Sequence, residues 1–587
     1  LHTVAGALYL QSGRFSGGTA NPPFLQVLFG LPSWLGLSTY DLKGDRPPYG
    51  GRMVNVALGL LLVIVASLWS YKLFGNWGGT LTLALFAFSP SFIAHTAITT
   101  TDVGVTTLIV LAIYVYWQGH ESKSILLTVL SGGIFGLAFA SKFTAAALIP
   151  VAIFIELFTS RNRQATWLRV LVNLLLVSIA CWIVFSSVYL FDGCFYEKRV
   201  RPDLKIPIPS FLAWMSPTQA VKGLEIKLSE MTRPGIHYYL GEYTKSGYWY
   251  YYPTIICLKT PMGTVFLALV FIYLIVSRAY IPKSYALYSM VPGLWFYFSF
   301  LTTNQAQGGI RHILPCYAFL FISLGALGKF VQRSKSIRTI VKLSLAINLF
   351  SVGLVFPCYL SYFNAVGDGL ATGPFPCVGP DLDYAQAEYL ILEKLEKLPK
   401  DKPIYICPKP TARPLVGYIV INCDSYLFMR PGKRHDYDWL DSFEAERVSR
   451  AWLLYDISEE KLRKQAKRRG ATYEELRTWI EYLLWEKRYE QTIKECITNY
   501  RKHPFVIAQW LTALILLERN NEALHRVLVH LRNKREKPPE LGELYMLCRH
   551  LCRKGKGSEK EQSAKALLGL MAINGILTED IRAKLLA

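Results

Sequence analysis

The feature that most constrains this chain is a series of long apolar runs separated by polar segments. Each run has about 16–24 residues, the length with which a helix crosses the hydrocarbon core of a bilayer. The ten runs lie at 52–74, 78–96, 103–117, 125–140, 143–158, 168–190, 262–277, 285–302, 313–330 and 339–357. They predict a mainly α-helical, multi-pass membrane domain over residues 1–357, followed by a soluble region.

Loop charges predict the orientation of these spans. Lys and Arg gather in alternate loops, whereas the short loops of the opposite side contain only Lys142 and Arg311. The basic loops are expected to face the cytoplasm. The opposite side then receives the C-terminal region and three outer loops, 1–51, 191–261 and 303–312. Because the Lys and Arg residues lie largely in loops beside the apolar runs and in the C-terminal region, membrane topology accounts for the formal net charge of +22, and no nucleic-acid partner is expected.

Asp102 is a single carboxylate between two apolar runs, at the end of Thr99-Thr100-Thr101. An acid at a membrane edge costs free energy unless it meets water, a partner or a substrate, which makes Asp102 a candidate catalytic residue. The alternative is a helix N-cap, a position that suits both Thr101 and Asp102. For an isolated Asp the cap would be favoured; the other outward polar residues favour a site.

Further polar groups are predicted on the same outer side. Arg311 and His312 follow Gly308-Gly309 at the outer end of a span, where a phosphate could approach the backbone and pair with the guanidinium. The alternative for this pair is a snorkelling Arg with a capping His. Lys142 and Lys259 are two more outward cations, for which interface anchoring and substrate binding are equally open.

The N-terminal outer loop reads as two short helices. Residues 2–10 form the first, beginning at His2, and 22–37 form the second, which is too short to cross and is expected to lie along the interface. In the central outer loop, Ser216-Pro217 begins a predicted interfacial amphipathic helix.

The stretch 247–253 in the same loop is rich in Tyr and Trp and contains Tyr250. Clustered aromatic residues at a bilayer surface usually form a belt. They also suit stacking against sugar rings. Composition favours neither interpretation.

From residue 358 the spans stop and the density of charge rises. Segments 402–407, 416–421 and 451–455 read as strands of a small α/β domain over 358–460. Residues 461–587 read as helical, with a spacing close to that of tetratricopeptide repeats, although a plain helical bundle fits equally well. Either arrangement predicts a docking module for a protein partner.

Taken together, these residues resemble the polytopic glycosyltransferases of the GT-C class, specifically the protein O-mannosyltransferase and aminoarabinose transferase superfamily. The resemblance covers residues 1–390 and rests on the order of short motifs. These are His-Thr-Val-Ala-Gly-Ala-Leu-Tyr-Leu (2–10), Asn-Pro-Pro-Phe (21–24), Thr-Thr-Thr-Asp (99–102), Ser-Lys-Phe-Thr (141–144), Tyr-Trp-Tyr-Tyr-Tyr-Pro (248–253), Lys-Thr-Pro (259–261), Gly-Ile-Arg-His-Ile-Leu-Pro (309–315), Tyr-Phe-Asn (362–364) and Asp-Leu-Asp-Tyr-Ala-Gln (381–386).

The resemblance implies transfer of a hexosyl or pentosyl group from a polyprenyl-phosphate carrier to an acceptor outside the cytoplasm. Asp102 matches the second acidic motif of the family, with a role in orienting the acceptor or the catalytic elements. Cations would neutralise the carrier phosphate as it leaves. The substrate-binding candidates are Arg311, His312, Lys259, Lys142, Tyr250 and His2.

Two features of the family are not matched within this sequence. Its principal Asp-Glu pair precedes the helix that His2 begins and is therefore expected before Leu1; an opening without Met or signal peptide suggests a fragment. Relatives often carry an acid and a basic residue before the Pro-Pro, and in the aminoarabinose branch that acid can bind metal. Here these positions are Ala20 and Asn21, so no cofactor is assigned and a divalent metal lacks support. The eleven scattered Cys favour neither a zinc site nor a disulfide framework.

The leading hypothesis is an integral membrane glycosyltransferase, placed in a bacterial inner membrane with its active site and C-terminal domain facing the periplasm or exterior. Its partners would be the bilayer, a lipid-linked sugar and an acceptor (protein, lipid or glycan). A transporter is the first alternative, against which no pair of interrupted spans in matching halves is visible. The second alternative is a membrane anchor that presents a helical-repeat scaffold. This hypothesis assigns no function to Asp102 or to Arg311-His312.

Overall fold

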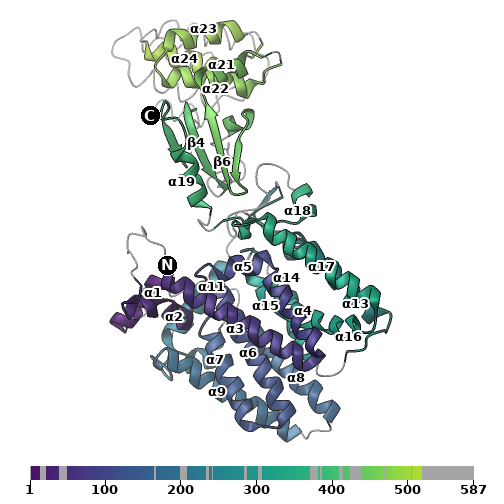
Figure 1. The fold of residues 1–587 in the computed structure, drawn as a ribbon. Helices are drawn as coiled ribbons and strands as arrows, with labels where there is room; N and C mark the ends of the chain where they lie inside the picture. The colour runs from purple at the N-terminus through teal and green to yellow at the C-terminus, as the bar shows by residue number, and fades with distance from the viewer. Residues whose placement is uncertain are drawn as a thin grey trace, which may run out of the picture. The chain divides into compact units, whose positions relative to one another are not determined.

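The computed structural model describes residues 2–13, 21–38, 49–163, 167–198, 208–232, 237–240, 242–282, 287–301, 307–370, 381–383, 387–408, 414–423, 438–468, 470–500, 502–503 and 506–517. The chain divides into two compact units (Figure 1). The first contains Leu1–Ile391 with Ser449–Ala451, and the second contains Leu392–Val448 and Trp452–Ala587. This division falls later than the predicted domain boundary after residue 357, which stays a prediction.

The first unit is a helical bundle, as the apolar runs predict. Its α-helices are α1 His2–Ser12, α2 Phe24–Trp34, α3 Tyr49–Phe74, α4 Asn76–Ala87, α5 Pro90–Thr96, α6 Thr101–Ser122, α7 Ile125–Phe139, α8 Leu148–Arg163, α9 Trp167–Val188, α10 Ser210–Met215, α11 Thr218–Thr232, α12 Tyr251–Lys259, α13 Met262–Val276, α14 Leu287–Leu301, α15 Leu314–Leu324, α16 Gly328–Val331, α17 Lys335–Leu354 and α18 Ala365–Leu370. Short 3-10 turns are η1 Phe143–Ala147, η3 Ile310–Ile313, η4 Gly325–Leu327 and η5 Tyr359–Ser361.

Five helical stretches among the described residues are long and apolar enough to cross a membrane, or seven if each of two bent pairs counts as one span. Burial separates them into central and peripheral helices. In α6 and in Ile310–Val331, 83% of the most apolar window is buried, against 11% in α9 and 17% in α17. The central helix α6 packs against α3, α7 and α15. The outward apolar faces of the peripheral helices suit contact with lipid.

Two bent helix pairs are present among the described residues: one lies within the predicted span 78–96, and the other joins the predicted span 262–277 to a helix in the preceding loop. Helix α4 and α5 meet at 68°, and α12 and α13 at 114°. Pro90 and Pro261 stand at the two breaks, each at or just before the start of the following helix. Proline lacks the N–H that would continue the preceding helix and is accepted in the first turn of a new one. Interrupted spans are therefore present among the described residues, and the statement used against a transporter, that no such pair occupies matching halves, stays a prediction.

The C-terminal half of α6 contacts a buried carboxylate of α8. Glu156 of α8 accepts hydrogen bonds from the Tyr116 hydroxyl at 2.5 Å and from Asn173 at 2.9 Å. The His120 Nε2 atom lies 2.7 Å from the same carboxylate. These contacts join α6, α8 and α9 at the end of α6 that is remote from Asp102.

The outer segments contain more structure than the sequence patterns predict. The predicted helices at 2–10, at 22–37 and after Pro217 correspond to α1, α2 and α11. Helix α1 packs against α2. The structure adds α10, the hairpin of β1 (His237–Tyr239) and β2 (Glu242–Thr244), and α12, which begins within the aromatic stretch.

The second unit contains a four-stranded sheet in the order β3-β4-β6-β5. Strand β3 (Ile404–Ile406) is parallel to β4 (Gly417–Asn422), and β4 is antiparallel to β6 (Trp452–Ile457). The three predicted strands are thus present, together with β5 (Glu446–Ser449) at the edge. Helix α19 (Glu388–Glu396) and the 3-10 turn η7 (Asp438–Ser442) complete the α/β part.

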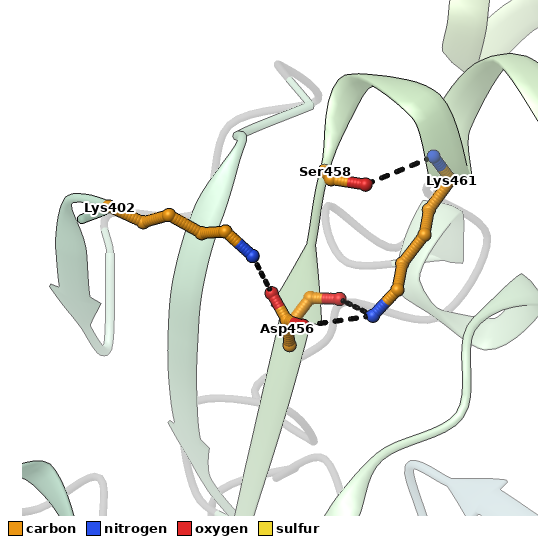
Figure 2. Close-up of polar contacts among 4 residues, drawn as sticks. All are labelled: Lys402, Asp456, Ser458 and Lys461. Atoms are coloured by element: carbon orange, nitrogen blue, oxygen red, sulfur yellow. Dashed lines mark hydrogen bonds and ion pairs between the residues drawn. The ribbon is translucent and has the colours of Figure 1, made fainter. Parts of the chain in front are cut away.

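The C-terminal end of β6 is tied to its neighbours by Asp456 (Figure 2). Its carboxylate pairs with Lys402 at 2.6 Å and with Lys461 at 3.0 Å. Ser458 caps the following helix by accepting a hydrogen bond from the Lys461 amide. The turn between sheet and helix is therefore fixed by both backbone and charge.

Within the described residues up to 517, four helices follow the sheet: α21 Glu459–Lys467, α22 Tyr473–Trp485, α23 Tyr489–Asn499 and α24 Ile507–Leu516. Consecutive helices pack on one another, and α22 begins with a capping box between Thr472 and Glu475. The predicted helical region beyond Leu517 lies outside the described residues, so the number of repeats stays a prediction.

Candidate active site

Asp102 lies in the first turn of α6 and is 3% exposed. The N-cap position belongs to Thr100, whose side chain makes no capping hydrogen bond. The Asp102 carboxylate instead forms an ion pair with the ammonium of Lys142, just after α7. Both side chains are largely buried, at 4% and 15% exposure. An ion pair in such a place is strongly held, because either charge alone would be left in a medium of low polarity.

Arg311 and His312 lie close enough to Asp102 to interact with its charge. Both belong to η3, which leads into the central helix α15. The Arg311 Nε atom donates to the Gly308 carbonyl at 2.8 Å, and the His312 Nδ1 atom lies 3.4 Å from the Tyr252 hydroxyl. Two polar motifs that are 209 positions apart in the sequence are thereby brought together (311 − 102).

The two glycines before η3 are needed for this geometry. A Cβ atom on Gly308 would lie 2.3 Å from the His312 ring, so the imidazole packs directly on the glycine backbone. Gly309 has φ of +91°, a conformation that side chains disfavour, and its missing Cβ would lie 3.0 Å from the Asp381 carboxylate.

His2, at the start of α1, interacts with the charges of Asp102, Lys142 and Arg311. Burial, assisted by the nearby cations, lowers the pKa of His2 to about 4, although the Asp102 carboxylate acts in the opposite direction. The imidazole is therefore neutral at pH 7, and it can serve as a hydrogen-bonding group rather than as a fixed cation.

Lys259 occupies a different environment from the one predicted for an outward cation. It is 1% exposed, at the end of α12. Its ammonium donates to the Leu360 carbonyl at 2.6 Å and to the Asp381 carbonyl, and lies 4.7 Å from the centre of the Phe363 ring. These contacts hold the segments after α17 against α12. A role for Lys259 in binding substrate stays a prediction.

Asp381 connects two segments of this site, although the family motif to which it belongs (381–386) implied no role for it. It is 2% exposed and accepts hydrogen bonds from the Tyr251 hydroxyl at 2.8 Å and from the Ile310 amide at 2.9 Å. The carboxylate thus fixes the start of η3, the element that carries Arg311. In the sequence, only the resemblance of residues 381–386 to a family segment pointed to Asp381, and it did not indicate which residues the carboxylate contacts.

Tyr250 belongs to an aromatic cluster formed by β1, the following loop and the start of α12. Its ring lies 5.4 Å from that of Tyr248, 5.6 Å from Trp249 and 6.5 Å from Tyr239. Burial and the charge of Glu242 raise the pKa of Tyr250. The described contacts of this ring are with the cluster, and substrate binding by Tyr250 stays a prediction.

Asn55 and His95 are two buried residues that the sequence analysis missed. Asn55, in α3, is fully buried and donates to the carbonyls of His95, Thr96 and Ile98 at 2.9, 3.1 and 2.6 Å. It thereby holds the turn that connects α5 to α6 and leads to Asp102. An uncharged polar residue inside the apolar run 52–74 was the signal that could have indicated it.

The arrangement combines one carboxylate with several groups that can carry positive charge or donate hydrogen bonds. Such a set can hold an anionic group such as a phosphate next to a polar acceptor, because fixed cations stabilise negative charge as it develops. Among the described residues, no group of three or more His, Cys, Asp or Glu is arranged to hold a metal ion. Ala20 lies outside the described residues.

Comparison with known proteins gives one family match. Residues 31–191 match the family model described as dolichyl-phosphate-mannose-protein mannosyltransferase. No curated protein sequence matches the chain. The matched segment contains Asn55, Asp102 and Lys142, and it confirms the predicted resemblance to membrane glycosyltransferases of the mannosyltransferase type.

Three solved structures are also similar in fold, with low scores. ArnT from Cupriavidus metallidurans, bound to undecaprenyl phosphate, has a TM-score of 0.41 at 12% identity, with 77% of this chain and 92% of that chain covered. Its apo form has a TM-score of 0.40 at 12% identity, with the same coverage. An oligosaccharyltransferase from Archaeoglobus fulgidus, tethered to an acceptor peptide, has a TM-score of 0.36 at 12% identity, covering 66% of this chain and 53% of that chain.

Proposed function

We propose that this protein is an integral membrane glycosyltransferase that moves a hexosyl or pentosyl group from a polyprenyl-phosphate carrier to a protein, lipid or glycan acceptor. The family match over residues 31–191 supports the donor class. The observation that carries the proposal is the buried ion pair of Asp102 and Lys142, with Arg311 and His312 in electrostatic contact with it.

The reaction assigns different tasks to these groups. The acceptor oxygen forms a bond to the anomeric carbon from the face opposite the carrier, the bond from that carbon to the phosphate oxygen breaks, and the acceptor proton passes to a base. Arg311 and His312 stabilise the phosphate as its charge increases. Asp102 positions the Lys142 ammonium and orients the acceptor. The site is proposed to face the non-cytoplasmic side, on the basis of loop charge.

The test is transfer by the full chain in proteoliposomes, with undecaprenyl-phosphate-linked mannose, glucose and aminoarabinose as donors. Arg311→Ala is expected to reduce transfer about 100-fold or more, and Arg311→Lys by less, because charge remains while the planar donor geometry is lost. Arg338→Ala is the matched control: Arg338 also bonds backbone carbonyls, at Val331 and Gln332, beyond the opposite end of the same span. Full transfer by folded Arg311→Ala and Asp102→Asn proteins would exclude the proposed site.

A transporter is the second candidate, because the two bent pairs α4–α5 and α12–α13 are a feature of transporter spans. The discriminating measurement is the chemical state of the sugar after incubation with sealed vesicles. Transfer predicts a new glycosidic bond and release of the free carrier phosphate. Transport predicts an unchanged molecule on the other side of the membrane.

A further inference from the structure

Buried polar atoms without a hydrogen-bond partner are concentrated at the turn that precedes Asp102. At this turn and beside it, the atoms are Thr3 Oγ1, Asn55 Oδ1, His95 Nδ1, His95 Nε2, Thr99 Oγ1 and Thr100 Oγ1, and the other such atoms of the described residues are distributed over the rest of the chain. His95 and Asn55 are 0% exposed. Buried polar groups in folded proteins are almost always hydrogen-bonded, and each one left alone costs about 1–3 kcal/mol. A concentration of them beside a candidate active site indicates a polar ligand.

The members of this set belong to three neighbouring elements. His95, Thr99 and Thr100 lie on or after α5, Asn55 on α3 and Thr3 on α1. Gly51 connects two of them, because a Cβ atom at that position would lie 2.6 Å from Thr3 Oγ1 and 3.1 Å from Thr99 Cγ2. The three carbonyl contacts of the Asn55 amide fix the backbone of the turn.

The chemistry of the set differs from that of the cations beside it. Hydroxyl groups and an amide oxygen are uncharged, and a neutral imidazole offers one donor and one acceptor. Such groups match the hydroxyls of a sugar, each of which donates and accepts, better than they match a phosphate. His95 nevertheless interacts with the charges of Asp102, Lys259, Asp381 and Arg311, so the turn adjoins the charged part of the site.

We propose that the turn from His95 to Thr100, together with Thr3, binds the hydroxyl groups of the glycosyl unit while the adjacent cations bind the carrier phosphate. This inference rests on the proposed function and adds to it the side chains that recognise the sugar. The hydroxyls of the bound sugar satisfy the otherwise unpaired atoms. Selectivity among donors then arises at this turn rather than at Arg311.

The experiment measures binding of three probes to the full chain in nanodiscs: undecaprenyl phosphate, undecaprenyl-phosphate mannose and undecaprenyl-phosphate glucose. The quantity of interest is the ratio of the Kd for the bare carrier to the Kd for the better sugar-bearing carrier. Wild-type protein is expected to give a ratio of about 10 or more. Thr100→Val and His95→Leu should each lower it about 3–10-fold, the effect of one hydrogen bond, with the Kd for the bare carrier unchanged.

Two further variants separate binding from structure. Thr107→Val removes a buried hydroxyl on the same helix as Asp102, but one that already bonds the carbonyls of Leu58 and Val103, and it should leave the ratio unchanged. His95→Gln retains a donor and an acceptor and should recover part of the ratio lost in His95→Leu.

The outcomes distinguish the inference from the proposed function. If no probe binds, the glycosyltransferase assignment fails. If all three bind but the wild-type ratio is near one, or if Thr100→Val and His95→Leu leave the ratio at its wild-type value, the carriers are recognised elsewhere and these atoms hold only structural water. Either result would overturn the assignment of the turn to the sugar.

Discussion

The side-chain amide of Asn55 donates a hydrogen bond of 2.6 Å to the carbonyl of Ile98, and the same nitrogen contacts the carbonyls of His95 and Thr96. One side chain of α3 thus satisfies the carbonyls at the end of α5, where a helix leaves them without intrahelical partners. The turn that precedes Asp102 is therefore held by a side chain from another helix. Its geometry depends on Asn55, for which no contact with the Asp102–Lys142 ion pair is described.

Replacement of Asn55 by Leu is expected to destabilise the protein by about 1–3 kcal/mol and to reduce sugar transfer strongly, because the carbonyls lose their donor and the Asp102 turn moves. Thermal unfolding and transfer would be measured on the same preparation. Asn348→Leu is the matched control: Asn348 is equally buried and bonds Thr264 between α13 and α17. It should cost similar stability while transfer per folded molecule is retained. Equal loss of transfer in both variants would refute a specific role for Asn55.

The ion pair of Asp102 and Lys142 predicts non-additive stability. Lys142→Met is expected to cost about 3–5 kcal/mol, since it leaves a buried carboxylate uncompensated. The double variant Asp102→Asn with Lys142→Met should be more stable than Lys142→Met alone, although none of these variants should transfer sugar efficiently. A double-mutant cycle in thermal unfolding measures the coupling, and strictly additive effects would show that the two charges do not depend on each other.

The sequence predicted the helical, apolar character of the first unit, because a bilayer imposes apolarity on each helix, but five to seven helical stretches of the described residues are long and apolar enough to cross, against ten predicted spans. It did not reveal the bend at Pro90, since the residues around this proline are apolar enough to form one continuous run. The position of Asp102 and Arg311 on one side followed from loop charge. In contrast, the contact of Asp381 with the Ile310 amide joins residues 71 positions apart, and no local pattern indicates such a pairing.

The buried location of Lys259 shows a second limit. A Lys two residues before Pro261 has the same sequence pattern whether it faces solvent or donates to two carbonyls within the protein. Only the packing of the segment around Leu360 decides between them, and that packing involves residues about a hundred positions away (360 − 259 = 101).

The glycines before η3 give a steric prediction. Gly308→Ala should displace His312, since the new methyl group would lie 2.3 Å from its ring, and Gly309→Ala adds strain at a positive φ together with a contact to Asp381. Each is expected to reduce transfer about 10-fold or more, by moving groups that must be placed within a fraction of an ångström. Gly353→Ala provides the control, because no atom lies within 4 Å of the position its Cβ would take. The transfer rates of all three proteins test this prediction. Unchanged rates for Gly308→Ala and Gly309→Ala would show that transfer does not require the close packing of the two glycines.

Asp456 gives a pH-dependent prediction for the second unit. Burial opposes ionisation, but the ammonium groups of Lys402 and Lys461 outweigh it, so the pKa of Asp456 is lowered from its ordinary value of 3.8. A carboxyl group with a depressed folded pKa adds stability above pH 3.8, and this stability is lost as the pH falls through the folded pKa. Because the pair is partly exposed, the contribution is expected to be about 0.2–1 kcal/mol and to decrease with salt.

Hydrogen–deuterium exchange of a peptide that covers β6 measures this contribution. Asp456→Asn should increase exchange at pH 6 relative to the wild type, and the difference should shrink as the pH falls below 3.8, because the Asp456 carboxylate is then progressively protonated and loses its charge. A difference that persisted at low pH would assign the effect to packing instead of charge.

The helix that carries Asp102 is anchored at both ends. The ion pair with Lys142 holds one end, and the contacts of Tyr116 and His120 with Glu156 hold the other. The 18 residues from Asp102 to His120 correspond to a rise of about 27 Å, which sets a fixed span between the two anchors (120 − 102 = 18). Hydrophobic mismatch in a thicker or thinner lipid is then expected to be absorbed by tilting of the peripheral helices α9 and α17, while the position of Asp102 within the bundle stays constant.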